Sequence, residues 1–309
     1  MIVGWIQLLG GLGLLIFGGD FIVRSAVKIA TYLKVSPMVV GLTIVSFGTS
    51  LPELVVSVNA ALSGHPDIAI GNIVGSNIAN LALVLGLTTT IRPIRVVRNN
   101  IVFDWPVMLL ATLVLVAFSI DNQVVRWEGL VLFALLMAYN FWVMRTGRLT
   151  SEVDLNTTLP RFTEVLRSVV ILVVSLAALI IGADILIDGA VTIARGWGIE
   201  ERVIAVTIIA FGTSAPELAT SLLALRNNES GLGIGNLIGS NIFNILGILG
   251  VTSLITDVRV SSELFDFDFY WLMLIPLLAF PFLIFNQKIG RILGLTLLAA
   301  YFSYLYFVF

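Results

Sequence analysis

Long apolar segments separated by short polar connectors make up nearly the whole chain. A helix that spans the hydrocarbon core of a bilayer needs about 20 apolar residues, so the pattern predicts ten spanning helices in two sets of five. A polar stretch at 147–164, with five charged residues and no apolar run, separates the two sets. The predicted helices cover residues 2–30, 37–62, 68–91, 101–120 and 126–146 in the first set, and 165–194, 202–225, 232–255, 266–285 and 288–308 in the second.

The two sets are copies of one another. GTSLPE at 48–53 returns as GTSAPE at 212–217, an offset of 164 residues, and the pattern IGNxxGSNIxN occurs at 70–80 and again at 234–244. Each copy contains an odd number of predicted spans, so the second copy must enter the membrane upside down, as in many secondary transporters. We therefore expect an all-α membrane protein with two inverted five-helix repeats.

The repeat gives the predicted domain boundaries. The first five-helix repeat covers 1–146, a cytoplasmic connector covers 147–164, and the second, inverted repeat covers 165–309. In such proteins, the binding site lies near the midplane where the two repeats meet.

The composition agrees with a membrane protein and excludes several other classes. The chain of 309 residues is 58% hydrophobic and 12% charged, against about 25% charged in soluble domains. A net charge of −2 gives no indication of a nucleic-acid partner, and the lack of cysteine excludes disulfides and thiolate metal sites. The single histidine, His65, falls in a short connector, so we assign it no role.

The distribution of basic residues predicts the orientation. Thirteen Lys and Arg residues fall in the connectors and helix ends on one side of the predicted spans, and four fall on the other. Cytoplasmic connectors carry the excess of positive charge. We therefore expect a multi-pass protein of the cell (inner) membrane with both termini outside and the 147–164 connector in the cytoplasm.

The repeated GTSxPE motif places costly groups inside an apolar segment. Pro52 breaks the helical hydrogen-bond ladder, Thr49 and Ser50 supply hydroxyl oxygens, and Glu53 supplies a carboxylate. Oxygen-only ligands suit a hard cation such as Na⁺ or Ca²⁺. The alternative is a proline kink beside a protonated glutamate. The second copy, with Glu217, favours the ion site because inversion brings the two glutamates together.

The second motif supplies neutral oxygen ligands. Ser76 and Asn80 are four residues apart and share one helix face, and Ser240 and Asn244 repeat the arrangement. We expect these two pairs to face the glutamates. The other asparagines of the motif are expected to join helices by hydrogen bonds; they are Asn72, Asn77, Asn236 and Asn241.

These motifs resemble the α-repeats of the cation/Ca²⁺ exchanger superfamily, and most closely its small prokaryotic Na⁺/Ca²⁺ exchangers. The resemblance extends over nearly the whole chain, in span number, repeat spacing and short connector. It implies that Glu53 and Glu217 are shared ligands of Ca²⁺ and Na⁺. It also implies a wider set of ligands: Thr49, Ser50, Thr213, Ser214, Ser76, Asn80, Ser240 and Asn244, with the backbone carbonyls of Ser46 and Ala210.

This chain departs from the family at one position. Many Na⁺/Ca²⁺ exchangers carry Asp where this chain carries Asn244. The predicted site thus holds two carboxylates rather than three, and ion selectivity and stoichiometry stay open at this stage.

The function expected from the sequence is a secondary antiporter, not an enzyme, which exports Ca²⁺ in exchange for Na⁺ by alternating access. The expected partners are the two transported ions and the lipid bilayer, with no cofactor. A Ca²⁺/H⁺ antiporter that uses the same glutamates is the main alternative, and a cation channel is a further one. Small residues in the first and sixth helices, among them Gly10, Gly18 and Gly182, suggest a sliding surface. The sequence carries no signal for an oligomeric state, for K⁺ coupling, or for an intramembrane hydrolase.

Overall fold

A computed structural model describes residues 2–95, 98–150, 160–198, 210–262, 264–286 and 288–308. Nearly all of these residues are helical. The first half contains α1 (Ile2–Leu33), α2 (Pro37–Val40), η1 (Gly41–Val45), α3 (Ser46–Thr49), α4 (Leu51–Leu62), α5 (Pro66–Ile78), η2 (Ala79–Leu85), α6 (Gly86–Ile91), α7 (Arg98–Phe118) and α8 (Arg126–Thr150), where η marks a π-helical segment.

The second half repeats this order. It contains α9 (Phe162–Gly196), α11 (Ala210–Thr213), α12 (Ala215–Arg226), α13 (Ser230–Ile242), η4 (Phe243–Leu249), α14 (Gly250–Ile255), η5 (Leu264–Asp268), α15 (Phe269–Asn286) and α16 (Arg291–Val308). The helices α8 and α9 extend into the stretch expected to be a connector, as far as Thr150 and from Phe162. Residues 151–159 lie outside the described part.

Seven helices of the described chain are long and apolar enough to cross a membrane. An eighth candidate is the pair Pro37–Thr49 and Leu51–Leu62, bent by 44°, and Val102–Phe118 is a shorter apolar helix. The remaining predicted span, 202–225, falls partly outside the described residues. The total of ten spans therefore stays a prediction.

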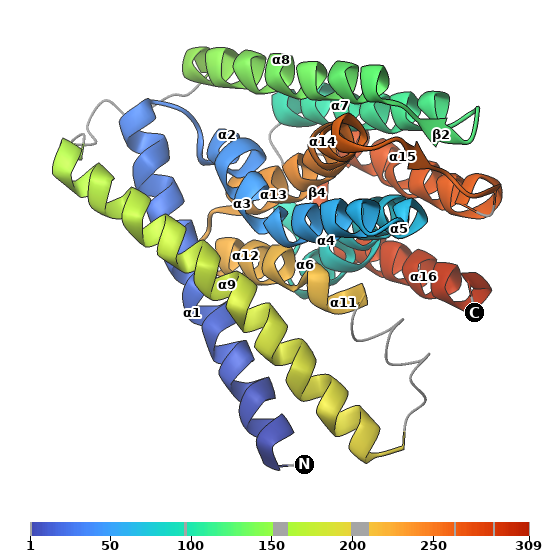
Figure 1. Ribbon diagram of the computed structural model, residues 1–309. Helices are drawn as coiled ribbons and strands as arrows, with labels where there is room; N and C mark the ends of the chain where they lie inside the picture. Colours follow the sequence, from blue (N-terminus) through green and yellow to red (C-terminus); the bar gives the residue numbers. More distant parts are fainter. Residues whose placement is uncertain are drawn as a thin grey trace.

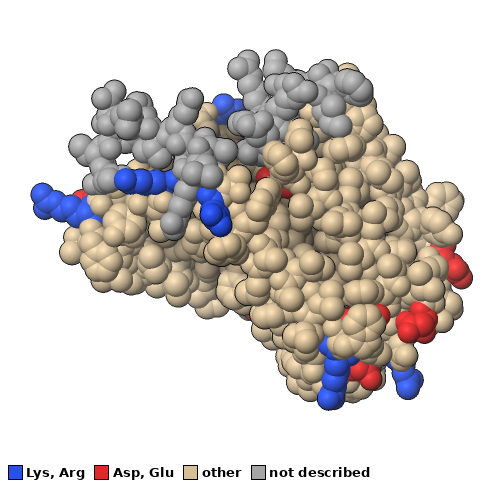
Figure 2. Space-filling view, turned by 90° about the horizontal axis from the view of Figure 1, so that it is seen from above, with Lys and Arg blue, Asp and Glu red and all other residues tan. Residues whose placement is uncertain are grey.

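Two layers of helices can be distinguished in Figure 1. The helices α4, α5, α7, α8, α15 and α16 run across the view, while the long pair α1 and α9 crosses them obliquely. The buried apolar side chains come from both halves and form one core. Figure 2 shows a face that is mostly uncharged, with Lys and Arg side chains at its left edge and charged groups of both signs along its lower rim. Such a surface suits a bilayer, which leaves charge to the ends of the spans.

Matching elements of the two halves are offset by the same 164 residues as the sequence repeat. The broken helix at Leu51 corresponds to the one at Ala215, and the π-helical segment at Ala79 to the one at Phe243. In Figure 1, the path from α3 to α4 runs from left to right, and the path from α11 to α12 runs from right to left. The two broken helices therefore point in opposite directions.

Among the described residues, two short antiparallel β-strand pairs depart from the expected all-helical fold. The strand β1 (Ile94–Arg95) pairs with β4 (Lys288–Ile289), and β2 (Gln123–Val124) pairs with β3 (Val258–Arg259). Each ladder connects one half to the other just outside the apolar spans.

Glycines set the close packing of α1 against α9. Gly4, Gly11 and Gly18 recur every seven residues and meet Gly189, Gly182 and Ser175 in reverse order, so the two helices are antiparallel. A Cβ on Gly11 would lie 2.5 Å from the backbone nitrogen of Leu186 and 2.6 Å from the Gly182 carbonyl oxygen. Small residues allow such backbone contact between membrane helices.

This α1–α9 contact, called the glycine seam below, changes one interpretation of the sequence. Gly18 and Gly182 hold the pair together, and Gly10 is exposed with nothing near its Cβ position. The glycine-rich stripe is therefore the interface within the pair rather than a surface on which the pair slides.

Gly11→Ala should weaken the α1–α9 contact because the added methyl group overlaps backbone atoms that cannot rotate away. Overpacking of this kind costs about 1–3 kcal/mol, which a lowered thermal transition of the purified protein in detergent would report. Gly10→Ala is the matched control, since its Cβ position is open. Equal transitions for the two variants would contradict the seam.

The orientation can be tested by thiol labelling because the chain has no cysteine. A cysteine at Ser151, in the connector, should react with a membrane-impermeant maleimide only from the cytoplasmic side. A cysteine at His65, which is exposed between α4 and α5, should react from outside. The neighbouring Gly64 is less suitable, since its φ of 81° strains any side chain. The reverse labelling pattern would invert the predicted topology.

Candidate functional site

Both GTSxPE motifs form helix breaks of the same geometry. Ser50 has φ −88° and ψ 9°, and Ser214 has φ −89° and ψ 5°. Each serine is followed by a helix whose second residue is proline, a position where the missing N–H costs no helical hydrogen bond. In the interrupted turn, a carbonyl that would bond to the proline nitrogen loses its helical partner. The breaks thus turn polar backbone and hydroxyl groups toward the centre of the protein.

Both polar motifs of the neighbouring helices run into π-helical segments. Asn80 is the second residue of η2, and Asn244 is the second residue of η4. Single π turns are rare and often occur at functional sites because they rotate side chains out of the regular helical register. Each asparagine is fully buried.

Glu53 and Glu217 are brought together at the centre of the fold. Each has an exposed fraction of 0%, and their carboxyl groups interact electrostatically. Neither Oε1 nor Oε2 of Glu53 has a hydrogen-bond partner among the described residues, and Oε2 of Glu217 has none either. A buried carboxylate without a partner is strongly destabilising, so this geometry fits a site completed by a cation.

Hydroxyl groups from both halves surround the Glu217 carboxyl. Ser50 donates from Oγ to Glu217 Oε1 at 3.3 Å, and Ser240 donates to the same oxygen at 3.5 Å. The Thr49 hydroxyl lies 3.5 Å from Ser240 Oγ and donates to Asn236 Oδ1 at 3.2 Å. Residues of the first motif thus meet the glutamate of the second, as the inverted repeat predicts.

Asn77 joins two helices by hydrogen bonds, as expected, and it orients Asn244, a partner that the sequence did not indicate. Asn244 donates from Nδ2 to Asn77 Oδ1 at 3.0 Å, which leaves Asn244 Oδ1 buried without a partner. Asn77 in turn donates to the backbone carbonyl of Asn241 at 3.3 Å. The free oxygen of Asn244 is therefore available as a ligand.

Three of the four asparagines expected to join helices do so, whereas neither Nδ2 nor Oδ1 of the buried Asn241 side chain has a partner among the described residues. Asn72 donates to the Glu53 carbonyl at 3.2 Å and to Ser57 Oγ at 3.0 Å, which ties α5 to α4. Asn236 contacts the site itself, since its Oδ1 accepts from the Thr49 hydroxyl, while its Nδ2 has no partner among the described residues. The repeat pattern already contained both residues, but it gave no means of telling their roles apart.

The other predicted ligands have different positions. Ser76 and Ser214 are buried, and the Ser214 hydroxyl has no partner among the described residues. The Ser46 carbonyl accepts hydrogen bonds from the Ser50 N–H at 3.1 Å and from the Thr49 hydroxyl at 3.4 Å. Thr213 is half-buried, and α11 begins at Ala210, whose side chain lies outside the described set.

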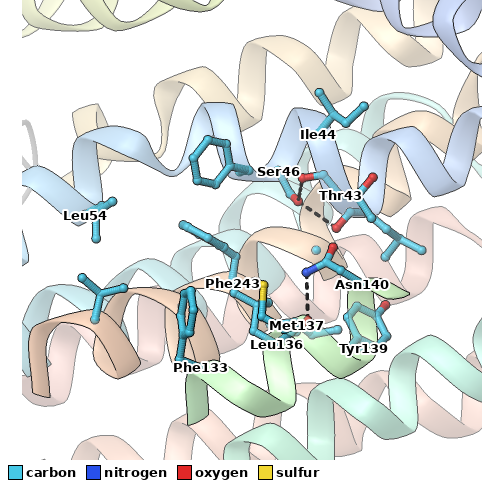
Figure 3. Close-up of a pocket in the computed structure, with 16 residues that line it drawn as sticks. Thr43, Ile44, Ser46, Leu54, Phe133, Leu136, Met137, Tyr139, Asn140 and Phe243 are labelled. Carbon is cyan, nitrogen blue, oxygen red and sulfur yellow. Dashed lines mark hydrogen bonds between the residues drawn. The ribbon is translucent and has the colours of Figure 1, made fainter. Parts of the chain in front are cut away.

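A mostly apolar cavity of about 450 Å³ lies beside the site, between η1, α8 and the α13–η4 helix. Figure 3 shows Thr43 and Asn140 at one end, Phe133 and Phe243 toward the other, and Ser46 between them. The Ser46 hydroxyl is satisfied by the carbonyls of Leu42 and Thr43. The cavity therefore borders the helix that carries Ser46, and the residues that line it are uncharged.

The chemistry of the donors is that of a hard-cation site. All the groups are carboxylate, hydroxyl, amide or carbonyl oxygens, which Na⁺ and Ca²⁺ prefer. Clusters of three or more His, Cys, Asp or Glu residues are absent from the described residues. Two carboxylates therefore carry the formal charge of the site.

The same sequence family matches both halves of the chain. The family described as sodium/calcium exchanger protein covers residues 3–145 and again 167–309, an offset that equals the internal repeat. This match extends over most of the chain and comes from two separate segments.

Individual relatives agree over their full lengths. The chain is 40% identical to the antiporter CaxA of Alkalimonas amylolytica, covering 100% of this chain and 99% of that protein. It is 31% identical to the sodium/calcium exchanger MaX1 of Methanosarcina acetivorans, with 99% of each covered. A structure of the sodium-calcium exchanger NCX_Mj, soaked with 10 mM Na⁺ and zero Ca²⁺, superimposes with a TM-score of 0.85, 36% identity and coverage of 98% and 97%. The chain therefore belongs to the sodium/calcium exchanger family of membrane ion antiporters.

Proposed function

We propose that this protein moves Ca²⁺ across the cell membrane in exchange for Na⁺, with Glu53 and Glu217 as ligands that the two ions share. The observation that carries the proposal is the pair of fully buried carboxyl groups with unpartnered oxygens. Because both ions would need the same two carboxylates, one ion must leave before the other binds. Competition of this kind converts a binding site into an exchanger.

Neutral oxygens would complete the coordination. Ser50, Ser240 and Thr49 already surround Glu217, and Asn244 presents a free oxygen. An ion at the Ser46 carbonyl would compete with the Thr49 hydroxyl that now donates to it. The other proposed ligands are Ser76, Asn80, Thr213, Ser214 and the Ala210 carbonyl.

Two inverted five-helix repeats would give this site access to each side in turn. The opposite directions of α4 and α12 and the constant offset between matching elements support this arrangement. The glycine seam joins α1 and α9 into one unit, which could shift as a body over the helices that hold the ligands. We propose no resident cofactor and no enzymatic reaction.

Proton coupling is the second candidate, because a buried carboxylate can exchange a cation for a proton. The same geometry serves either driving ion. The names of the relatives MaX1 and NCX_Mj favour Na⁺. A channel is less consistent with a site whose ligands are fully buried.

Glu53→Gln and Glu217→Gln should each abolish Na⁺-driven Ca²⁺ uptake nearly completely. Each change removes a charged ligand from a desolvated site, where one lost charge partner costs several kcal/mol. The assay is ⁴⁵Ca²⁺ uptake into Na⁺-loaded proteoliposomes, with and without an outward Na⁺ gradient.

Asp104→Asn is the matched control. Asp104 is also buried and accepts a hydrogen bond from the Tyr139 hydroxyl at 3.2 Å, but it lies outside the site. Asparagine keeps an acceptor for Tyr139, so uptake should persist. Robust uptake by either glutamine variant would refute the assignment of the ligands.

Transport should also depend on voltage. The two carboxylates are neutralised by one Ca²⁺, and the family resemblance implies three Na⁺ per Ca²⁺, which would leave one net positive charge with the Na⁺-loaded carrier. Each cycle would then move one elementary charge, worth about 2.3 kcal/mol per 100 mV. In Na⁺-loaded vesicles the positive charge leaves, so a potential positive inside, set by valinomycin and external K⁺, should speed Ca²⁺ uptake.

The outcomes of the voltage experiment separate the coupling modes when the pH gradient is collapsed. Uptake that ignores voltage but needs Na⁺ would mean two Na⁺ per Ca²⁺. Uptake that follows an imposed pH gradient and ignores Na⁺ would show that the proton is the coupled ion.

A further inference from the structure

Asp20 connects the long helix pair to the end of α12. Its Oδ1 accepts a hydrogen bond from Asn227 Nδ2 at 2.9 Å, and its Oδ2 lies 2.8 Å from Arg24 of the same helix. The Asp20 side chain is 25% exposed and that of Arg24 is 66% exposed. Since exposed ion pairs contribute little, the link between the two halves rests on the hydrogen bond to Asn227.

The α12 side of this link is fixed by other contacts. Arg92, which follows α6, donates to the Leu225 carbonyl at 2.8 Å and to Asn228 Oδ1 at 2.9 Å. Asn228 has a φ of 63° and ends the helix in a left-handed conformation that asparagine tolerates. Asn227 is thus held in place, and α1 is the partner that can separate from it.

Beside the link, α1 covers α12. A Cβ on Gly19 would lie 2.6 Å from Leu223 Cδ1 and 3.4 Å from the Ala219 carbonyl oxygen. Leu223 is 8% exposed, and Ile22 of α1 is 0% exposed. Direct helix contact therefore covers this face of α12 between Glu217 and Asn227.

The positions related by the repeat are open. The counterpart of Asp20 is Asp184 on α9, which is exposed, and the counterpart of Asn227 is Ser63 at the end of α4. Among the described residues no hydrogen bond joins Asp184 to Ser63. The face of α4 that corresponds to the covered face of α12 is uncovered, with Asn59 exposed and Val55 57% exposed.

We propose that Asp20 and Asn227 form a latch that holds the cytoplasmic side of the ion site closed, and that Asp184 and Ser63 form its counterpart when the site opens to the cytoplasm. The proposal rests on the alternating access of the proposed function and on the predicted orientation. Because the glycine seam makes α1 and α9 one unit, closing one latch opens the other.

The two latches are unequal. At the second, Asp188 places a like charge four residues from Asp184, so the carboxylate of that latch is repelled by a neighbour of its own helix. The Ser63 side chain, which would donate to Asp184, is also shorter than the Asn227 side chain that donates to Asp20. We therefore expect the Asp20–Asn227 latch to be the more stable of the two when no transported ion is bound.

Two single cysteines can report the latch in the full-length protein, purified in detergent without Na⁺ or Ca²⁺. Ala219→Cys lies under α1 and should react slowly with a charged methanethiosulfonate, whereas Asn59→Cys should react quickly. Asp20→Ala or Asn227→Ala should raise the rate at position 219 about tenfold or more, the population shift expected from loss of one hydrogen bond to a charged group, and should lower the rate at position 59. Asp184→Ala should slow position 219 further.

Matched variants test the specific contact. Arg24→Gln should leave both rates unchanged. The double variant Asp20→Asn with Asn227→Asp exchanges donor and acceptor, so it should restore slow labelling at position 219, and this rescue shows that the protein is folded. Unchanged rates in the single alanine variants, or no rescue in the double variant, would overturn the latch. The labelling experiment needs no transported ion, so it tests the latch alone. If the assignment of Glu53 and Glu217 as ligands is wrong, only the ⁴⁵Ca²⁺ assay of the glutamine variants will show it.

Discussion

The burial of two carboxyl groups at the centre of an apolar helical protein is the constraint on which the rest of the structure depends. Glu53 and Glu217 have no exposed surface and lie close enough to interact. Two like charges at this depth are costly without a cation. The helix breaks, the hydroxyls around Glu217 and the free oxygen of Asn244 all supply what a bound cation needs. Under the proposed function, a cation that offsets this cost can leave only when another takes its place, which suits an exchanger.

Transport also needs a part that moves while the ligands stay in place. The glycines of α1 and α9 bring two backbones into contact along several turns, so these helices form one unit. The helices that carry the proposed ligands pack as closely as α1 and α9 do. A Cβ on Gly239 of α13 would lie 2.5 Å from the Leu42 carbonyl oxygen. Close packing within each unit leaves the contact between them as the place where motion costs least. The Asp20–Asn227 hydrogen bond lies at that contact.

Much of the site could be predicted because its signal is local. Glu53 and Glu217 were predicted from carboxylates in apolar segments, Thr49 and Ser50 from hydroxyls of the same motif, and Ser240 from the helix face that it shares with Asn244. In the structure Ser50 and Ser240 both donate to Glu217, and Thr49 lies beside Ser240. The partner of Asn77 could not be predicted, since its contact with Asn244 joins residues 167 positions apart and depends on how two helices cross. For the same reason the glycine stripe of α1 was assigned to the wrong surface. The spacing of the glycines shows that one face of the helix allows close packing. It does not show which helix packs against that face.

The sequence alone determined the helical membrane class, the twofold repetition and the oxygen chemistry of the site, because hydropathy, register and donor type are properties of short segments. The tertiary structure alone decided which of the two equivalent broken helices is covered. The two halves carry nearly the same motifs, so their sequence is compatible with cover on either α4 or α12. Packing breaks this symmetry: α1 covers Leu223 of α12, while α9 leaves Asn59 of α4 exposed. The closely packed α1–α9 pair covers one of the two equivalent faces and not the other, and this is the physical reason that a repeated sequence adopts an asymmetric structure.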